Sequence, residues 1–236
     1  MPEVKGSLIE RIKRTQTVES FRFSVREKIT FQPGQFLQVI FDEGKRDNKD
    51  SNKFLSMSSS PTKDYIEVTK RISESPFSRR LSDLKINDEI LLKLPMGECV
   101  FKNEFEKIGF LIGGIGITPV ISIIEYINDK KLDTDAFLFY SNRTDEDIAF
   151  KKELDQWQSV NKNIKVTYTV TDCQPKDKTC VFGFIDKDLL LKKACDITGR
   201  TLFIYGPPAM VNEMCNLTLK LECRKENVKT ERFIGY

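Results

Sequence analysis

The sequence predicts two folded parts: an antiparallel β-barrel or sandwich, followed by a doubly wound parallel α/β fold. In the first hundred residues, short segments such as 21–25 alternate apolar and polar side chains and are separated by turn residues. From about residue 104, continuous apolar strands alternate with helical patterns, which is typical of a parallel sheet covered on both faces. We therefore predict one domain over residues 1–103 and a second over residues 104–236.

The elements of the first part are short and bounded by turns. Pro33 and Gly34 form a turn before the second strand, Pro95 and Gly97 end the last one, and residues 42–52 form a charged loop. Ser75 is a candidate N-cap for a helix over residues 76–84. The predicted strands are 21–25, 36–41, 66–69 and 90–94.

The second part alternates strand and helix without interruption. Strands are predicted at 108–112, 136–140, 164–170 and 201–205, and helices at 119–126, 147–158, 187–193 and 211–225. Such an order implies right-handed crossovers and a ligand crevice at the carboxyl ends of the strands.

Composition excludes several kinds of chemistry. The chain of 236 residues has no histidine, so Ser-His-Asp triads, Cys-His dyads and HExxH zinc sites are excluded. Its 38 Lys and Arg against 35 Asp and Glu argue against a nucleic-acid partner. The six cysteines lack CxxC spacing, which predicts small buried thiols and no metal site. The apolar stretch 110–124 is too short for a membrane span, and the N-terminus has no apolar signal core, so we expect a cytoplasmic protein.

A glycine-rich turn directly follows the first apolar strand of the second part. Gly113, Gly114 and Gly116 would let the backbone approach a phosphate, and the next helix would offer its positive end. Thr118 and Pro119 suit the first turn of that helix. The spacing differs from GxGxxG, and a tight turn without a ligand would show the same pattern.

Two further strand ends point to a nucleotide. Ser141 and Arg143 follow the next strand, where they would suit a 2′-phosphate and favour NADPH over NADH; a solvated loop arginine is the alternative. After the last strand, Gly206 and Pro207 form a small rigid turn against which a flat ring could lie.

Taken in order, these motifs resemble the ferredoxin–NADP reductase superfamily. The segments that carry the resemblance are PGQF at 33–36, SMSSSP at 56–61, SPFSRRL at 75–81, PMGE at 95–98, the glycine turn, GPPAM at 206–210 and ERFIGY at 231–236. The resemblance covers nearly the whole chain. It implies an antiparallel flavin-binding barrel over 1–103 and an NAD(P)-binding doubly wound domain over 104–236.

The resemblance also implies roles for individual residues. Ser56 matches the serine that hydrogen-bonds near flavin N5 and, with Tyr236 of the C-terminal aromatic region, is a candidate catalytic residue. Lys53 takes the place of an arginine for the flavin phosphate, and Ser78 lies in the segment that caps that phosphate. The implied cofactor-binding set is Lys53, Phe54, Leu55, Ser56, Met57, Ser58, Lys70, Ser75, Phe77, Ser78, Gly113, Gly114, Gly116, Thr118, Pro119, Ser141, Arg143, Tyr205, Gly206, Pro207, Met210 and Phe233.

Three positions depart from the family pattern. Leu55 stands where the family has a stacking aromatic, Lys53 replaces an arginine and loses its bidentate fork, and Tyr205 stands where many members have a cysteine. We hypothesise that Tyr205 or Tyr236 supplies the aromatic contact that Leu55 lacks. Phe36 is expected in the barrel core.

The expected function is hydride transfer from NADPH or NADH to FAD, rather than FMN, and electron transfer to a separate ferredoxin-like protein. None of these steps needs histidine, because the flavin supplies the chemistry. Two alternatives stay open at this stage. The chain could reduce free flavin or another small acceptor, or it could be a nucleotide-binding regulatory or assembly subunit with a degenerate flavin site.

Overall fold

The computed structural model describes residues 1–233, which form two compact units. The first unit comprises residues 1–101 together with 118–126, and the second comprises residues 102–117 and those from 127 onward. The division runs through a single helix, α2 (Ile117–Asp129), whose residues 118–126 pack with the first unit.

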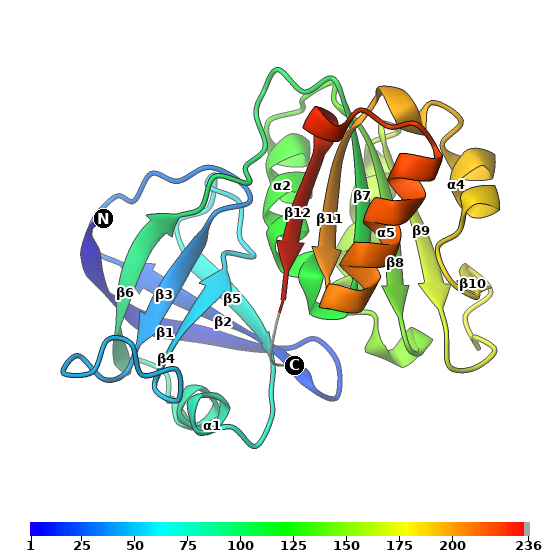
Figure 1. Ribbon diagram of the computed structural model, residues 1–236. Helices are drawn as coiled ribbons and strands as arrows, with labels where there is room; N and C mark the ends of the chain where they lie inside the picture. The colour runs from blue at the N-terminus through cyan, green and yellow to red at the C-terminus, as the bar shows by residue number, and fades with distance from the viewer. Residues whose placement is uncertain (234–236) are drawn as a thin grey trace. The chain divides into compact units, whose positions relative to one another are not determined.

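The first unit is built on one antiparallel sheet of six strands. Its order is β4-β3-β6-β1-β2-β5 (Figure 1), and an isolated antiparallel bridge from Met57 to Val68 joins the two edges, so the sheet curls toward a barrel. The predicted barrel-type fold is confirmed. The strands are β1 (Glu3–Lys13), β2 (Val18–Val25), β3 (Phe36–Ile40), β4 (Asn52–Ser56), β5 (Ile66–Arg71) and β6 (Glu89–Met96).

Alternation along these strands directs one set of apolar side chains inward. Phe21 and Phe23 on β2 and Val68 on β5 are fully buried in this core. Helix α1 (Pro76–Asp83) contributes Phe77 and begins as predicted, because the hydroxyl of Ser75 accepts a hydrogen bond from the Ser78 amide at 3.3 Å.

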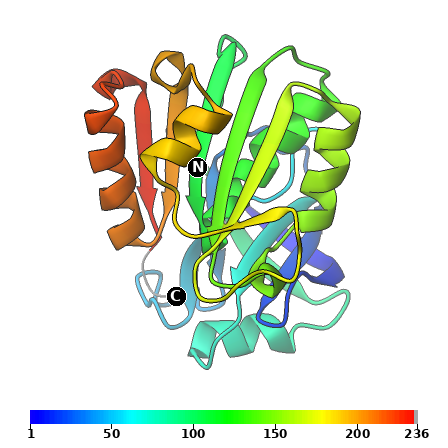
Figure 2. The same ribbon diagram turned by 90° about the vertical axis from the view of Figure 1, so that its right-hand side faces the viewer.

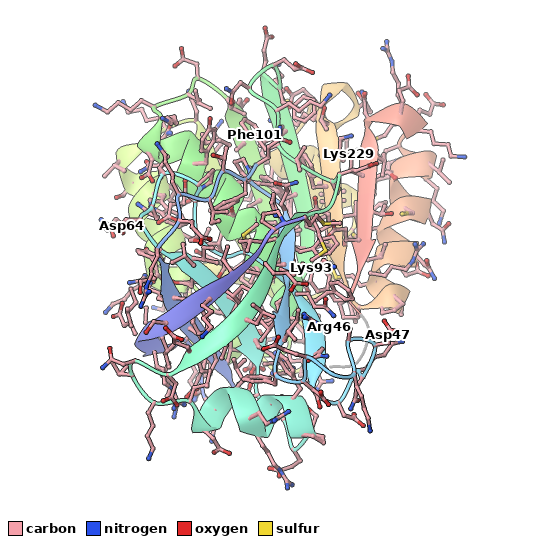
Figure 3. All side chains as sticks on the ribbon, turned by 90° about the vertical axis from the view of Figure 1, so that its left-hand side faces the viewer. Arg46, Asp47, Asp64, Lys93, Phe101 and Lys229 are labelled. Atoms are coloured by element: carbon pink, nitrogen blue, oxygen red, sulfur yellow. The ribbon has the colours of Figure 1, made fainter. Side chains whose placement is uncertain are left out.

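The charged loop between β3 and β4 is held by one buried side chain. Figure 3 shows Arg46 and Asp47 on this loop. The Asn52 amide nitrogen donates to the carbonyls of Asp42, Lys45 and Arg46, and its oxygen accepts from the Phe41 and Asp42 amides. Asn52 thus makes five of the hydrogen bonds that hold the loop preceding Lys53.

The second unit contains a parallel sheet in the order β10-β9-β8-β7-β11-β12, with helices on both of its faces (Figure 2). The doubly wound prediction is confirmed. Its elements are β7 (Lys107–Gly113), β8 (Asp135–Asn142), α3 (Lys151–Val160), β9 (Ile164–Val170), β10 (Cys180–Phe182), α4 (Lys187–Lys193), β11 (Thr201–Gly206), α5 (Pro208–Lys220) and β12 (Val228–Arg232), and helix α2 follows β7.

Alternate residues of the central strands separate the two faces. Leu111, Phe139 and Ile204 pack in one cluster with Leu190 of α4 and Val211 of α5. The strands are apolar throughout because both faces are covered, as their continuous apolar sequence predicts.

Several elements differ from the predicted ones. Helix α5 begins at Pro208 instead of residue 211, since a proline fits the first helical turn. Helix α3 begins only at Lys151, after a 3₁₀ turn and Phe150, whose φ of 60° breaks the helix. Strands β1, β4, β10 and β12 were not predicted, because their patterns are mixed or very short.

The cysteines are free, and only part of the prediction for them holds. Cys180 and Cys223 are buried, but Cys173 and Cys195 are exposed, so the prediction of uniformly buried thiols is wrong. Among the described residues, no helix is both long and apolar enough to cross a membrane.

Candidate functional site

The segment that follows β4 begins with Ser56, the predicted hydrogen-bond donor to a flavin. Ser56 ends β4 opposite Phe36 and is 6% exposed. The next residue, Met57, is fully buried, and its amide donates to the Gln35 carbonyl at 3.1 Å. Strand pairing thus fixes the backbone on both sides of the Ser56 hydroxyl.

Ser58 is held by a buried carboxylate that the sequence analysis did not identify. The Ser58 hydroxyl donates to Glu67 at 2.9 Å, and the guanidinium groups of Arg14 and Arg22 donate to the same carboxylate at 3.2 and 2.7 Å. The Ser58 amide also donates to the Glu67 carbonyl at 2.8 Å. Glu67, a residue of β5, therefore ties the serine segment to β2 and to Arg14, which follows β1. Nothing in the sequence indicated that Glu67 is buried. It occupies an outward position in the alternating pattern of β5, and such positions are ordinarily solvated.

A cationic cluster lies near α1 in the first unit. Lys70 is 2% exposed, and its ammonium donates to the Arg71 carbonyl at 2.9 Å. Burial, and then the neighbouring charges of Lys53 and Arg71, lower the pKa of Lys70 to about 8. A buried amine destabilised by two neighbouring cations fits an anion such as a phosphate, which would relieve the repulsion. Arg71 was not predicted.

Hydroxyl groups form a hydrogen-bonded cluster at the start of α1. The hydroxyl of Ser75 donates to Ser78 at 3.0 Å, and Ser73 shares a hydrogen bond with Ser78 at 3.2 Å. Phe77 is fully buried beneath Lys53, whose ammonium lies 6.0 Å from the ring centre. The N-terminus of α1 adds positive potential.

The aromatic surface near Ser56 differs from the expected arrangement. Leu55 packs in the barrel core, whereas Phe54 is 59% exposed. The ring of Phe36 meets Phe54 edge-on, with 5.9 Å between the ring centres, and lies against Gly97. Phe36 is half-buried, so the prediction that it belongs to the barrel core is wrong. The structure thus exposes an aromatic side chain one residue before the position that the resemblance indicates.

The glycine turn of the second unit has two kinds of glycine. A Cβ on Gly113 would collide with Met210, and one on Gly116 would lie 2.6 Å from the Tyr205 carbonyl oxygen, so both serve close packing. Gly114 has a φ of 52° and open space where a Cβ would point. Gly114 is therefore where the backbone offers room for a ligand.

The turn after β11 lies against the glycine turn. Gly206, with a φ of 157°, approaches Gly113 so closely that a Cβ would lie 3.2 Å from its backbone, and Pro207 would also contact a Cβ on Gly113. Tyr205 is fully buried and packs edge-on against Phe203, which gives no support to a stacking role for Tyr205. The second unit thus brings together the two predicted turns.

Thr118 and Pro119 open helix α2 directly after the glycine turn. Thr118 is 2% exposed, and both residues lie in the first helical turn, with Ile117 preceding them in αR conformation.

The end of β8 carries an unsatisfied polar group. Asn142 is 6% exposed, and neither atom of its side-chain amide has a hydrogen-bond partner. Ser141 is half-buried and Arg143 is exposed, with the Arg143 carbonyl accepting from the Asp172 amide at 2.9 Å. A buried, unpartnered amide beside an exposed arginine fits a polar ligand such as a nucleotide. Asn142 was not among the predicted site residues.

A carboxylate arranges the neighbouring loop. The carboxylate of Asp145 accepts hydrogen bonds from the amides of Lys176 and Asp177 at 2.8 and 2.9 Å. These bonds, of which that from Asp177 has the larger effect, lower the pKa of the Asp145 carboxyl. Asp177 in turn pairs with Lys151 of α3 at 3.0 Å.

The C-terminal region is described only in part. The Phe233 amide donates to the Gly206 carbonyl at 3.0 Å, so Phe233 extends from β12 beside the turn after β11. Burial raises the pKa of Glu231 in β12 to about 7. Tyr236, the second candidate catalytic residue, lies outside the described residues.

Comparison with known proteins agrees with these features. The model of the oxidoreductase NAD-binding domain family matches residues 110–216. The NADH-cytochrome b5 reductase 2-A of Vanderwaltozyma polyspora is 33% identical over 149 residues, which span 61% of this chain and 50% of that protein. The chain thus matches about half the length of this curated relative.

Solved structures reproduce the fold over nearly the whole chain. The flavohaem-like FAD/NAD-binding domain of nitric oxide dioxygenase from Vibrio cholerae has a TM-score of 0.83 at 16% identity, covering 98% of both chains. A ferredoxin–NADP⁺ reductase from Neisseria gonorrhoeae, solved with bound FAD and NADP, has a TM-score of 0.79 at 20% identity, covering 98% of this chain and 99% of that one.

The chain combines a curled antiparallel sheet that carries a cationic cluster with a parallel sheet that carries an open glycine turn. The chain thus contains a match to the oxidoreductase NAD-binding domain family, and its fold is the one seen in the solved ferredoxin–NADP⁺ reductase.

Proposed function

We propose that the chain is an NAD(P)H-dependent flavoprotein reductase that passes electrons to a separate redox protein. The observation that carries the proposal is the presence of two anion-binding arrangements in one chain. One is the cluster of Lys53, Lys70 and Arg71 in the first unit, and the other is the glycine turn at Gly114 in the second. The named relatives and the family model support the same class.

The residues of the first unit fit FAD. Lys70 and Arg71 would neutralise a flavin phosphate, and the Ser75 and Ser78 hydroxyls would bind its oxygens. Bound flavin would supply the acceptance of a hydride from NAD(P)H and the release of electrons to a partner. Ser56 would orient and polarise the ring by a hydrogen bond; it is not a nucleophile.

The residues of the second unit fit a nicotinamide nucleotide. Gly114 would admit a phosphate to the backbone, and Asn142 would gain the polar partner that it lacks. Arg143 would contact a 2′-phosphate, which favours NADPH, whereas the names of the relatives favour NADH. These residues would bind the nucleotide and fix its orientation.

The test is to purify the protein, identify any flavin it retains, and titrate it anaerobically with NADPH and NADH. We expect a yellow protein whose visible band bleaches on addition of either nucleotide. A protein that binds no added flavin and oxidises neither nucleotide would contradict the proposal and favour a regulatory or assembly subunit. Arg143→Ala should raise the KM for NADPH by about tenfold and leave that for NADH nearly unchanged, because only NADPH carries the extra phosphate.

The identity of the acceptor is tested separately. Reduction of a ferredoxin or of a cytochrome b5 would distinguish two classes of protein partner. A second candidate function, reduction of free flavin, is favoured by the burial of Leu55 in the core, which removes a stacking residue from the flavin surface. Complete loss of flavin on gel filtration, with full activity restored by free flavin as substrate, would support that function.

A further inference from the structure

Helix α2 is hydrogen-bonded to the serine segment that follows Ser56. The hydroxyl of Ser122 donates to the Ser59 carbonyl at 2.7 Å, and the carboxylate of Glu125 accepts from the Ser60 amide at 2.8 Å. Ser122 and Glu125 are three residues apart, so they share one face of the helix. Both contacts lie within the first compact unit.

These contacts are well shielded from water. Ser59, Ser60 and Ser122 are each no more than 1% exposed, and the Glu125 side chain is 14% exposed. Glu125 also pairs with Lys63 at 3.3 Å. Hydrogen bonds to a charged group in such surroundings are stronger than neutral, solvated ones.

The serine segment is fixed on its other side by β5. The Ser59 hydroxyl accepts from the Glu67 amide at 2.9 Å, and the Ser58 hydroxyl donates to the Glu67 carboxylate. Residues 58–60 therefore have little freedom to shift without breaking a buried hydrogen bond. They stand two to four residues after Ser56, while Ser122 stands one helical turn after Thr118.

We propose that Ser122 and Glu125 are positioning residues. Through their hydrogen bonds, the position of the N-terminal turn of α2 determines the position of the segment that follows Ser56. This inference rests on the proposed function, in which Ser56 contacts the flavin. Neither residue touches a reacting atom. Their effect is on the position of the Ser56 hydroxyl, and the rate of hydride transfer to a bound flavin is steeply sensitive to such a displacement.

The experiment compares the wild type with Ser122→Ala, Glu125→Ala and Glu125→Gln, each loaded with flavin. The readouts are the hydride-transfer rate constant at saturating NAD(P)H, measured by stopped flow, the KM for the nucleotide, and the change in the flavin spectrum on binding NAD(P)⁺. We expect Glu125→Ala to slow hydride transfer about tenfold or more and to reduce the spectral change, with the KM altered less than threefold. Glu125→Gln keeps an acceptor for the Ser60 amide and should recover most of the rate.

Two control variants separate positioning from stability. Lys63→Met removes the ion pair but leaves the bond from Ser60 to Glu125, and it should transfer hydride at the wild-type rate. Thr134→Val removes a comparable bond, from a hydroxyl 3% exposed to the Phe105 carbonyl at 3.1 Å, in the second unit. It should lower the melting temperature as Ser122→Ala does, without slowing hydride transfer.

The outcomes are distinguishable from failure of the proposed function. If the wild type neither binds flavin nor reacts with NAD(P)H, the proposed function fails, and this inference fails with it. If the wild type reacts and both alanine variants match its rate, only the positioning role is overturned. If Glu125→Ala does not fold, the milder Ser122→Ala variant decides, since it deletes one hydroxyl.

Discussion

At the scale of single residues, buried charges mark where the first unit departs from an ordinary barrel. Lys70 occupies an inward position of β5 next to Val68, where an apolar side chain would pack without cost. Its pKa of about 8 records the penalty of burial and of the nearby Lys53 and Arg71. In the proposed function a flavin phosphate would offset this penalty, which would make Lys70 a sensitive probe of flavin binding.

Replacement of Lys70 by methionine should change the pH dependence of stability. Because the pKa falls from 10.5 when unfolded to about 8 when folded, the unfolded chain binds more protons between these values, and the flavin-free wild type should gain stability as the pH rises from 8 to 10.5. Lys70→Met should lack this gain in urea unfolding. It should also weaken flavin binding by about tenfold, the effect of losing one charge-assisted hydrogen bond.

The control for this prediction is Lys85→Met, since Lys85 is exposed. It should follow the wild-type curve in both measurements. If Lys70→Met bound flavin as tightly as the wild type, Lys70 would not belong to the phosphate site.

Glu67 should be the most costly single charge to remove in the barrel. Its side chain is 3% exposed, and Glu67→Ala would leave the guanidinium of Arg14, itself 7% exposed, without its buried partner. We expect a loss of about 3–5 kcal/mol in the free energy of unfolding, measured by urea denaturation. Glu10→Ala, which breaks a pair of Arg22 with a half-exposed carboxylate, should cost less than about 1 kcal/mol.

At the scale of elements, the strand-to-helix turn places different demands on two nearby glycines, Gly114 and Gly116. Gly116 is required because the backbone after β11 passes within contact distance, whereas Gly114 faces open space. The glycine motif in the sequence does not show which glycine is needed for close packing and which one faces open space.

Alanine substitutions should separate them. Gly114→Ala has room for its methyl group and should cost only about 1 kcal/mol for a φ of 52°, but it should raise the KM for NAD(P)H about tenfold. Gly116→Ala should instead lower the melting temperature strongly, since the methyl group would meet the Tyr205 carbonyl. Equal nucleotide affinity in Gly114→Ala and the wild type would show that no ligand approaches this turn.

At the scale of the whole molecule, each unit has its own core, and a buried cluster of charges lies at one end of the second unit's sheet. At the amino end, the guanidinium of Arg200 is 1% exposed and pairs with Asp135 and Asp196 at 2.7 and 2.9 Å. Burial alone would raise the pKa of Asp196, but hydrogen bonds from Arg200 and Lys107 hold it at about 2.

This arrangement predicts the acid limit of stability. A carboxyl whose pKa falls from 3.8 unfolded to about 2 folded stabilises the protein above pH 4, and that contribution is lost as the pH falls from 4 to 2. Asp196→Asn should therefore be less stable than the wild type at pH 7, and the difference should shrink between pH 4 and pH 2 in urea unfolding. A difference independent of pH would contradict this account.

The sequence by itself determined the two folds, the glycine turn and the cap at Ser75, because these depend on local periodicity and on backbone geometry that particular residues require. The tertiary structure alone decided that Glu67 and Asn142 are buried, that Phe54 and not Leu55 presents an exposed side chain, and that α2 is bonded to the serine segment. Each of these depends on contacts between residues distant in the chain, and burial created by such contacts leaves no periodic trace in the sequence.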